Sequence, residues 1–369
     1  MKTVVLTGGG TAGHCTPNVA LIPYLEKYFD KTVYIGSEKG IERDIVKNLN
    51  IPYYKIPTAK LERKFTPRNL AIPVKLVSGV YKARKILKKI DPSVVFSKGG
   101  YVSLPVVIAA KSLKIPVVSH ESDLSVGLAN KIASRFSDVT LTAFKKTAGE
   151  IKNGRYVGTP IRAELYKKRD KNAVLKKLGL DKNKKTVLVT GGSQGADSIN
   201  RAVADSIDAL TEKYNVILVC GKGKSTGKTA KNFYETEYAK DMGELMAAAD
   251  ACVSRAGANT LMELISLGMP TVAIPLPKGN SRGDQEENAA YLKRKKLITV
   301  LEESRLSGVN LLKKLETLEK NCDEIRERCL ATDLKSGAEK IAEIIASYAS
   351  GKAEKTIRRR TPARAAKQK

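Results

Sequence analysis

Two glycine-rich segments have the composition of main-chain phosphate sites. Residues 8–13 follow the apolar run 4–6, and residues 191–196 follow the apolar run 187–189. A glycine loop between a strand and a helix brings N–H groups and the positive end of the helix dipole to one place, which favours a bound anion. The sequence therefore predicts two anion sites, about 180 residues apart, in two similar halves.

Candidates for acid–base and polar chemistry are few. The only two histidines, His14 and His120, both follow predicted strands, and the sequence favours a functional role over ordinary surface or core histidines. Glu263 falls near the first turn of a predicted helix, where it could accept hydrogen bonds from a ribose diol. The alternative is a carboxylate that is simply favoured by the helix dipole.

We expect no metal ion and no cofactor. The sequence has no Asp-x-Asp pair, and two histidines are too few for a histidine-rich metal site. Chemistry on a diphosphate must then rely on backbone N–H groups, helix dipoles and side-chain donors.

Two other nucleotide motifs are weak or absent. Residues 8–13 fit the dinucleotide pattern G-x-G-x-x-G, but a lone match is weak, and a simple dehydrogenase would leave the second glycine loop without a task. Residues 220–229 resemble a P-loop, but the first glycine of that motif is replaced by Leu218 or Lys222, depending on the register. A Walker A ATPase is therefore excluded.

The elements that must position these loops are strands that alternate with helices. This alternation predicts a doubly wound parallel sheet in each half, and 369 residues suit two domains. We place the domains at 1–162 and 163–335, with a last helix at 336–350 and a disordered basic tail at 351–369. Five cysteines without a Cys-x-x-Cys motif, no signal peptide and no long apolar run indicate a reduced, cytosolic protein without a membrane span.

The charge is strongly positive and unevenly distributed. The net charge is +28, and residues 58–98 alone contain 11 basic and 2 acidic residues. Such an excess indicates an anionic partner, either nucleic acid or an acidic membrane surface. An apolar patch ringed by cations would consist of Ile72, Val74, Leu76, Lys82, Arg84, Lys85, Lys88 and Lys89. The alternative is an ordinary helix with a solvated lysine face.

Taken together, the motifs resemble those of the MurG family, transferases that add N-acetylglucosamine to lipid I in peptidoglycan synthesis. The resemblance runs from residue 4 to about residue 348. It rests on Gly-Gly-Thr-Ala-Gly-His at 9–14, Lys-Gly-Gly-Tyr-Val-Ser at 98–103, His-Glu at 120–121, Gly-Thr-Pro-Ile-Arg at 158–162, Gly-Gly-Ser-Gln-Gly-Ala at 191–196, Ser-Arg-Ala-Gly-Ala-Asn-Thr at 254–260 with Glu263, and Asp-Gln-x-x-Asn at 284–288.

The resemblance implies an α/β fold of the GT-B class, with two Rossmann-like domains across a cleft and the last helix returning to the first domain. The implied donor is UDP-N-acetylglucosamine (UDP-GlcNAc). Its implied contacts are Thr11, Ala12, Gly13, Asp123, Arg162, Ser193, Ala239, Ala258, Asn259, Thr260, Glu263 and Gln285. The implied seat for the acceptor's diphosphate is Gly9, Gly10, Gly99, Gly100 and Tyr101.

The implied reaction is an inverting transfer to the C4 hydroxyl of a lipid-linked MurNAc-peptide, converting lipid I to lipid II. His14 is the candidate base or acceptor-orienting group, and Glu121 and Asp123 are lesser candidates. Many members of the family have asparagine where this chain has Asp123, and an ionised aspartate cannot donate as an amide does. The lipid acceptor implies a peripheral protein on the cytoplasmic face of the cell membrane, bound to its anionic surface.

Two alternatives remain at this stage. One is another GT-B transferase with a different sugar nucleotide or acceptor. The other is a basic nucleotide-binding or nucleic-acid-binding protein that is not an enzyme. Aromatic residues make up only 5% of the chain, tryptophan is absent and no base-stacking motif occurs, so no nucleic-acid partner is expected.

Overall fold

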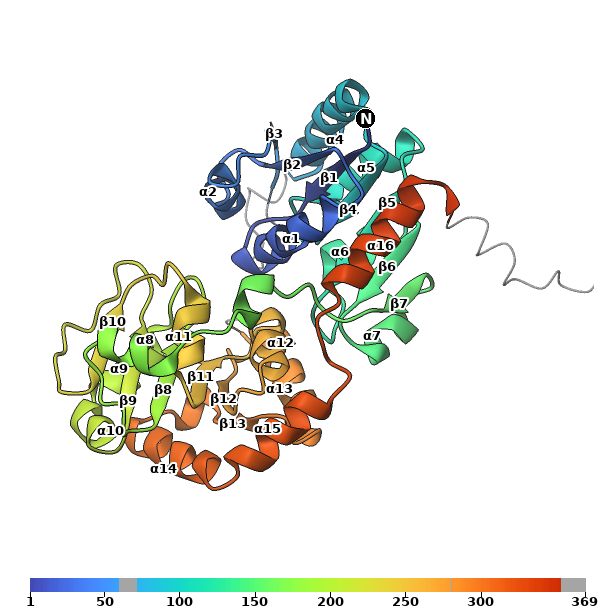
Figure 1. Cartoon of the computed structure of the whole chain (residues 1–369). Coiled ribbons are helices and arrows are strands. Elements are labelled where there is room, and N and C mark those ends of the chain that lie inside the picture. The colour runs from blue at the N-terminus through green and yellow to red at the C-terminus, as the bar shows by residue number, and fades with distance from the viewer. Residues whose placement is uncertain (60–71, 280, 353–369) are drawn as a thin grey trace, which may run out of the picture. The chain divides into compact units, whose positions relative to one another are not determined.

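The computed structural model describes residues 1–59, 72–279 and 281–352, and it contains two units, each built on its own parallel sheet (Figure 1). Unit 1 comprises residues 1–121, 126–160 and 337 onward, and unit 2 comprises 122–125 and 161–336. The observed division thus falls two residues before the predicted one, and the segment 122–125 belongs to unit 2. The tail predicted from residue 351 lies outside the described residues from 353 onward.

Unit 1 has seven strands in the order β3-β2-β1-β4-β5-β6-β7, with every neighbouring pair parallel. The strands are β1 (Thr3–Thr7), β2 (Lys31–Ser37), β3 (Tyr53–Ile56), β4 (Val94–Ser97), β5 (Val117–Glu121), β6 (Val139–Thr142) and β7 (Gly154–Tyr156). The helices are α1 (Ala12–Leu25), α2 (Ile41–Lys47), α4 (Ile72–Ile90), α5 (Leu104–Ser112), α6 (Leu128–Ala133), α7 (Lys145–Glu150) and α16 (Ala338–Ala349).

Helices cover both faces of the unit 1 sheet, which explains why its central strands are continuously apolar. In β1, Val4 and Leu6 join a core with residues of α1 and α16, whereas Val5 joins a core with residues of α4 and α5. Helix α16 comes from the end of the chain but lies beside α1 (Figure 1). Its residues Ile341 and Ile345 are fully buried there. The last described helix is therefore part of the core of unit 1.

Unit 2 repeats this arrangement with six strands in the order β10-β9-β8-β11-β12-β13, also parallel. The strands are β8 (Thr186–Thr190), β9 (Asn215–Val219), β10 (Phe233–Thr236), β11 (Ala251–Arg255), β12 (Thr271–Ile274) and β13 (Thr299–Val300). The helices are η1 (Ala163–Tyr166), α8 (Lys171–Lys177), α9 (Asp197–Ala204), α10 (Ile207–Lys213), α11 (Met242–Ala248), α12 (Ala258–Ser266), α13 (Asp284–Arg294), η2 (Glu303–Arg305), α14 (Gly308–Glu319) and α15 (Cys322–Ala331).

The strand order reverses direction at one point in each sheet, between β1 and β4 in unit 1 and between β8 and β11 in unit 2. Open α/β sheets bind their ligands at the carboxyl ends of the strands at such a switch point. Both predicted glycine loops leave the sheet there, because one follows β1 and the other follows β8. The topology therefore gives each unit a ligand-binding edge.

Candidate functional site

The first glycine loop, residues 8–13, connects β1 to α1 in unit 1. Helix α1 begins at Ala12, has no acidic residue in its first turn, and has Thr11 at its N-cap without a side-chain capping bond. N–H groups of a first turn have no acceptor within the helix. Ala12 and Gly13 therefore lie at the positive end of a 14-residue helix, a place that suits a phosphate.

A second glycine segment, residues 98–101 after β4, packs directly against this loop. The N–H of Gly9 donates to the carbonyl of Gly99 over 3.4 Å. A Cβ atom on Gly100 would lie 2.4 Å from the Gly9 carbonyl oxygen, and one on Gly10 would lie 2.3 Å from the Tyr101 ring. The structure thus brings together all five residues predicted to seat the acceptor's diphosphate, with glycine required by the close approach.

Two of the predicted phosphate donors are already engaged, however. The N–H of Gly10 donates to Glu42 Oε2 over 3.1 Å, and the N–H of Gly9 is used by Gly99. A diphosphate at this edge would therefore draw on the start of α1 or on the segment 98–101 before it drew on Gly9 and Gly10. Their role in diphosphate binding stays a prediction.

His14 is the third residue of α1 and faces both glycine segments. Its Nδ1 lies 2.9 Å from Thr11 Oγ1, and a Cβ atom on Gly100 would lie 3.2 Å from the same nitrogen. A hydrogen bond at one ring nitrogen orients the imidazole and sets its tautomer. The position suits a general base or a group that orients an acceptor hydroxyl.

His120 does not lie in a loop, contrary to the prediction. It is part of β5, its side chain is fully buried, and its Nε2 lies 2.8 Å from the Gly158 carbonyl oxygen. Burial lowers the pKa of His120 well below its usual value, and the charge of Lys98 lowers it further. The imidazole is therefore neutral and internal, because all five residues of β5 are buried.

Glu121 ends β5 and is 4% exposed. Its Oε2 accepts hydrogen bonds from the N–H of Gly127, over 3.1 Å, and from Asn130 Nδ2, over 2.9 Å. These contacts hold the beginning of α6 against the sheet. These bonds explain the burial of the Glu121 carboxylate without a catalytic role, so His14 is better placed than Glu121 to act as a base.

In unit 2 the second glycine loop connects β8 to α9. A Cβ atom on Gly195 would lie 2.0 Å from the Cys220 carbonyl oxygen, so the loop touches the end of β9 through its backbone. Gly192 has a φ of 81°, in the left-handed region that favours glycine. Ser193 lies at the exposed tip between these glycines, where a diphosphate is predicted.

Helix α12 brings the predicted ribose and backbone contacts to the same edge of unit 2. It begins at Ala258 after Gly257, so Asn259 and Thr260 belong to its first turn, and Glu263 lies in the next turn. No acidic residue opposes an anion in that first turn. Glu263 is 9% exposed, which is unusual for a carboxylate without an ionic partner.

Arg162 is that partner. Its Nε and Nη2 donate to the two carboxylate oxygens of Glu263, each over 3.0 Å. This bidentate geometry fixes the plane of the carboxylate. Each carboxylate oxygen has more than one lone pair, so Glu263 can still accept from a diol. Two residues predicted to contact the donor are thus joined to each other in unit 2.

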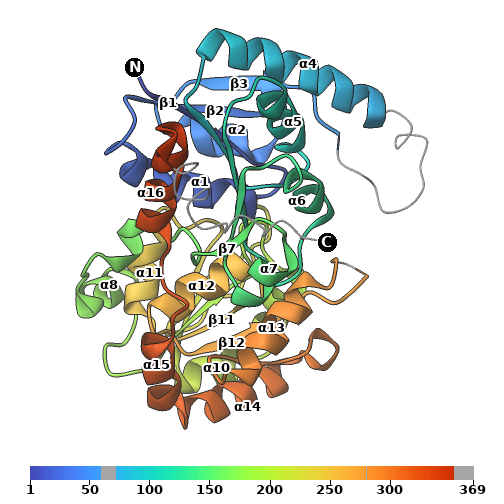
Figure 2. The same cartoon turned by 90° about the vertical axis from the view of Figure 1, so that its right-hand side faces the viewer.

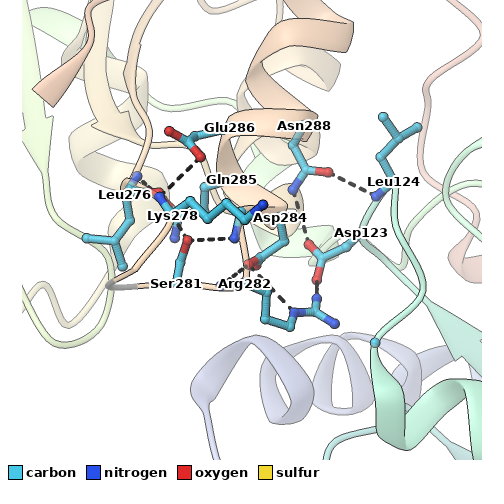
Figure 3. A network of polar contacts seen from close by, with 12 residues as sticks. Asp123, Leu124, Leu276, Lys278, Ser281, Arg282, Asp284, Gln285, Glu286 and Asn288 are labelled. Atoms are coloured by element: carbon cyan, nitrogen blue, oxygen red, sulfur yellow. Dashed lines mark hydrogen bonds and ion pairs between the residues drawn. The ribbon is translucent and has the colours of Figure 1, made fainter. Parts of the chain in front are cut away.

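Asp123 also belongs to unit 2, where it contacts α13 and the segment before it. Its Oδ2 accepts from Arg282 Nη2 over 2.6 Å, and its Oδ1 accepts from Asn288 Nδ2 over 3.1 Å (Figure 3). The N–H of Leu124 in turn donates to Asn288 Oδ1 over 2.9 Å. Both oxygens of Asp123 therefore act as acceptors, a task that an aspartate performs and an asparagine amide does not fully replace.

Gln285 and Ala239 occupy different parts of unit 2. Gln285 is the second residue of α13, and its Oε1 accepts from the N–H of Leu276 over 3.0 Å (Figure 3). The backbone thus holds the amide oxygen and fixes the orientation of the amide group, while the contact of Gln285 with a sugar hydroxyl stays a prediction. Ala239 is half-buried between β10 and α11, next to the exposed Tyr238.

One polar network in unit 2 has no signal in the sequence. Arg255, at the end of β11, donates to both oxygens of Glu303 over 2.7 and 2.9 Å and to Ser198 Oγ over 2.9 Å. Ser198 is the second residue of α9. The network therefore connects the beginning of α9, behind the glycine loop, to the segment that leads into α12. Glu303 is remote in sequence and carries no motif, whereas Arg255 lay within a recognised motif.

The predicted cationic patch lies on α4 (Figure 2). Gly79, Ala83 and Leu87 form the buried face of this helix. On the opposite side Val74, Val77 and Tyr81 are 71%, 70% and 61% exposed. The apolar part of the patch therefore differs from the predicted one only in part, because Val74 is exposed as predicted, whereas Ile72 and Leu76 are half-buried and Val77 and Tyr81 are exposed instead.

The cations of α4 also differ from one another. Lys82 lies 3.5 Å from Glu38, and Arg84 donates to Ser112 Oγ. Lys85 Nζ lies 4.8 Å from the centre of the Tyr81 ring, while Lys88 and Lys89 are exposed at the end of the helix. Over the part of the chain that the structure describes, no helix combines the length and apolar character needed to cross a membrane.

No cluster of three or more potential metal-binding side chains occurs among the described residues. Both ligand-binding edges instead offer backbone N–H groups, the starts of α1 and α12, and hydroxyl, amide and guanidinium donors. Such groups can stabilise a leaving diphosphate electrostatically.

Comparison with known proteins agrees with this geometry. Residues 4–142 match the model of the glycosyltransferase family 28 N-terminal domain, and residues 186–345 match that of its C-terminal domain. A Clostridium perfringens protein named UDP-N-acetylglucosamine--N-acetylmuramyl-(pentapeptide) pyrophosphoryl-undecaprenol N-acetylglucosamine transferase is 43% identical over 347 residues, 93% of this chain and 97% of the relative. A Clostridium botulinum protein of the same name is 42% identical over 353 residues, 94% and 99% of the two chains.

A solved structure extends the likeness to the fold. The crystal structure of Acinetobacter baumannii MurG superposes with a TM-score of 0.73 at 24% identity, covering 94% of this chain and 99% of the other. The predicted fold class, two Rossmann-like parallel-sheet domains of the GT-B type, is confirmed.

Proposed function

The chain belongs to glycosyltransferase family 28, and we propose that it transfers N-acetylglucosamine from UDP-GlcNAc to the C4 hydroxyl of a pyrophosphoryl-undecaprenol-linked MurNAc-peptide, converting lipid I to lipid II. The observation that carries the proposal is the 43% identity to a transferase of that name across almost the whole of both chains. Two glycine loops, one at the switch point of each sheet, support it, because both substrates contain a diphosphate.

Unit 2 binds the donor in this proposal. The loop around Ser193 and the start of α12 take the diphosphate, and Glu263, oriented by Arg162, accepts from the ribose diol. Gln285 donates to the sugar, and Ala239 borders the uracil. Asp123 accepts from Arg282 and Asn288, and so holds the segment 122–125 beside α13.

Unit 1 binds the acceptor and supplies the base. The acceptor's C4 oxygen attacks the anomeric carbon, the bond from that carbon to the UDP oxygen breaks, and the configuration inverts. His14 takes the proton from the C4 hydroxyl, since its Nδ1 is held by Thr11 and it faces the glycine segments. Thr11, Ala12 and Gly13, at the beginning of α1, approach the donor sugar.

The reaction proceeds without a metal ion in this proposal. The charge that develops on the UDP oxygens is stabilised by the N-terminal ends of helices and by backbone and side-chain donors of unit 2. No cofactor takes part, because a displacement at the anomeric carbon is not a redox reaction.

The direct test is an assay for transfer of labelled N-acetylglucosamine from UDP-GlcNAc to a lipid I analogue without added metal. We expect a disaccharide product and equimolar UDP, both dependent on the MurNAc acceptor. UDP-glucose and UDP-GalNAc, tested in parallel, should be poorer donors. Tight UDP binding without acceptor-dependent transfer would instead favour another acceptor.

The protein also works at an anionic membrane surface on the cytoplasmic side, where the lipid-linked acceptor offers its sugar. The exposed stripe of Val74, Val77 and Tyr81 continues along α4 into Lys85 and Lys88. An apolar stripe flanked by lysines is the arrangement of a helix that lies in the headgroup region of an acidic membrane.

Charge removal on α4 tests the membrane proposal. Replacing Lys85, Lys88 and Lys89 by Gln should weaken binding to phosphatidylglycerol-containing vesicles about 100-fold, since each lysine contributes about 1 kcal/mol. The matched control replaces Lys293, Lys295 and Lys296 at the end of α13, which are exposed and include a lysine over a tyrosine ring. Equal losses in both variants would indicate diffuse charge attraction and would remove α4 as the docking surface.

A further inference from the structure

Glu42 is a buried carboxylate beneath the first glycine loop. It lies in the first turn of α2 and is fully buried. Its Oε2 accepts from the N–H of Gly10 over 3.1 Å, and its Oε1 accepts from the N–H of Ser37 over 3.1 Å and from the Ser37 hydroxyl. The carboxylate thus bridges the end of β2 and the middle of the glycine loop.

The surrounding backbone is shaped to this carboxylate. A Cβ atom on Gly9 would lie 2.5 Å from Glu42 Cδ, and one on Gly40 would lie 2.1 Å from Glu42 Oε1. Two glycines in different segments therefore leave room for one side chain. A buried charge costs several kcal/mol unless donors surround it, so a placement of this kind needs a reason beyond filling space.

We propose that Glu42 is a positioning residue that holds the first glycine loop in its reactive shape and, through the loop, orients His14. Gly10 immediately precedes Thr11, whose hydroxyl lies 2.9 Å from His14 Nδ1. A Cβ atom on Gly10 would also meet the Tyr101 ring, so a shift of Gly10 moves the contact with the 98–101 segment. The Glu42 carboxylate therefore determines the position of His14 and of both glycine segments, 8–13 and 98–101.

Other side chains hold the start of the first glycine loop, so Glu42 stabilises only the middle of the loop. Tyr34 Oη donates to the Gly8 carbonyl over 2.7 Å, and Asn18 Nδ2 donates to the Thr7 carbonyl over 3.2 Å. These bonds fix the residues next to β1. Beyond them, the N–H of Gly10 has Glu42 as its acceptor, so loss of Glu42 should displace Gly10 and Thr11 while leaving β1 in place.

A carboxylate is required because each of its oxygens accepts from a backbone N–H. A glutamine at this position has a single acceptor oxygen, so its NH2 group would face the N–H of either Ser37 or Gly10. Glu42→Gln keeps the volume of the side chain and therefore separates charge and hydrogen bonding from packing. Glu42→Ala removes both acceptors and should have the larger effect.

The test compares these variants with Asp44→Asn, which removes the same charge from an exposed position on the same helix. We expect kcat/KM for the lipid acceptor to fall about 10- to 100-fold in Glu42→Gln, since small misplacements of a catalytic group have effects of this size. The KM for UDP-GlcNAc should change less than the acceptor kcat/KM, because unit 2 supplies most of the proposed donor contacts. Amide hydrogen exchange of the peptide containing Gly10 should become faster in Glu42→Gln and Glu42→Ala only.

Ser37→Ala separates a merely structural role from a positioning role. It removes the hydroxyl bond to Oε1 but leaves the bond between Glu42 and Gly10, so it should lower the Tm without the loss in acceptor kcat/KM. Acceptor kinetics that follow Tm across all variants, or equal losses for donor and acceptor, would overturn the proposal. If Glu42→Ala does not fold, Glu42→Gln decides alone, because it preserves the packing.

The kinetic part rests on the proposed transfer reaction, but the exchange measurement does not. A wild-type protein without transfer activity would contradict the proposed function and leave the Glu42 contact to be decided by amide exchange. Active wild-type protein with unchanged Gly10 exchange in Glu42→Ala would contradict the positioning role alone.

Discussion

The two glycine loops leave sheets of the same strand order, yet they are held in different ways. In unit 1 the loop is supported from below by side chains, with Tyr34 and Asn18 at its start and Glu42 at its middle. In unit 2 the loop packs through its backbone, at Gly195, on the Cys220 carbonyl, and the side-chain bond to it is a local one, from the N–H of Gly192 to Thr190 Oγ1 over 3.3 Å. The charged network of that half, Arg255 with Glu303, lies behind the loop at α9.

Under the proposed function, the difference follows from what each loop holds, a base in unit 1 and a diphosphate in unit 2. A loop that carries a base must fix one side chain, His14, to within a fraction of an ångström, and directional hydrogen bonds from buried side chains provide that precision. A loop that wraps a diphosphate needs mainly N–H groups and space. We therefore expect changes in unit 1 to lower turnover and changes in unit 2 to weaken donor binding.

The largest effect should come from His14. Replacing it by Ala removes the base and should lower kcat by about 10²- to 10⁴-fold, the usual contribution of a positioned base. Steady-state kinetics at saturating substrates provide the measurement. A decrease in kcat of less than tenfold, with donor affinity unchanged, would show that His14 is not the base. It would also contradict the distinction drawn between the two loops.

Glu263 should give the next largest effect, of a different kind. Glu263→Ala removes the acceptor for the ribose diol and leaves the Arg162 guanidinium without its partner. Hydrogen bonds to a charged group contribute about 1.5–3 kcal/mol, so the KM for UDP-GlcNAc should rise about 10- to 100-fold. Glu287→Gln, exposed on α13, is the control. An unchanged donor KM would contradict the ribose assignment.

Replacement of Glu303 should change the stability of unit 2, and the change should depend on pH. Its hydrogen bonds with Arg255 keep the pKa of Glu303 below its usual value, against a smaller opposing effect of burial. The stabilisation is therefore complete above the unfolded-state pKa, near 4.3, and is lost as the pH falls through the lower folded-state pKa. Glu303→Gln should lower the free energy of unfolding of unit 2 by about 1–3 kcal/mol at pH 7.

Thermal unfolding from pH 7 to pH 3 measures this effect. The difference in Tm between the wild type and Glu303→Gln should shrink below about pH 4, as Glu303 becomes protonated. Glu302→Gln is the control, because the Glu302 side chain is 70% exposed and 4.0 Å from Arg305. A Tm difference that stays constant down to pH 3 would mean that packing, and not charge, connects α9 to β11.

The smallest expected effect is that of metal removal. Transfer in EDTA should equal transfer in Mg²⁺ within about twofold, since helix ends and side-chain donors stabilise the leaving UDP. A loss of more than tenfold that Mg²⁺ or Mn²⁺ restores would show that these groups do not suffice.

Much of the fold followed from local patterns. Continuous apolar runs such as 4–6 and 187–189 predicted buried parallel strands, and the glycines after them predicted the turns at the switch points. The histidine in β5 was placed wrongly, because His120 follows an apolar run but continues the strand. A polar residue inside a buried strand looks, from sequence alone, like the first residue after it.

The residues that sequence reasoning missed act through distant partners. Glu42 and Glu303 sit in ordinary charged segments, and only the folded chain brings one to Gly10 and the other to Arg255. Likewise, the motif alone compares Asp123 with the asparagine of related proteins. The ion pair of Asp123 with Arg282, 159 residues away, is visible only in the structure. Motifs identify the groups that touch substrates, but the side chains behind them depend on tertiary contacts.

The most direct test of the account is two-substrate initial-rate kinetics of the wild type, His14→Ala and Glu263→Ala, with UDP-GlcNAc and a lipid I analogue. We expect His14→Ala to lower kcat and leave the donor KM nearly unchanged, whereas Glu263→Ala should raise the donor KM and leave kcat nearly unchanged. If both variants altered the same constant, or if the wild type transferred no N-acetylglucosamine to the acceptor, the division of labour between the two units would be wrong.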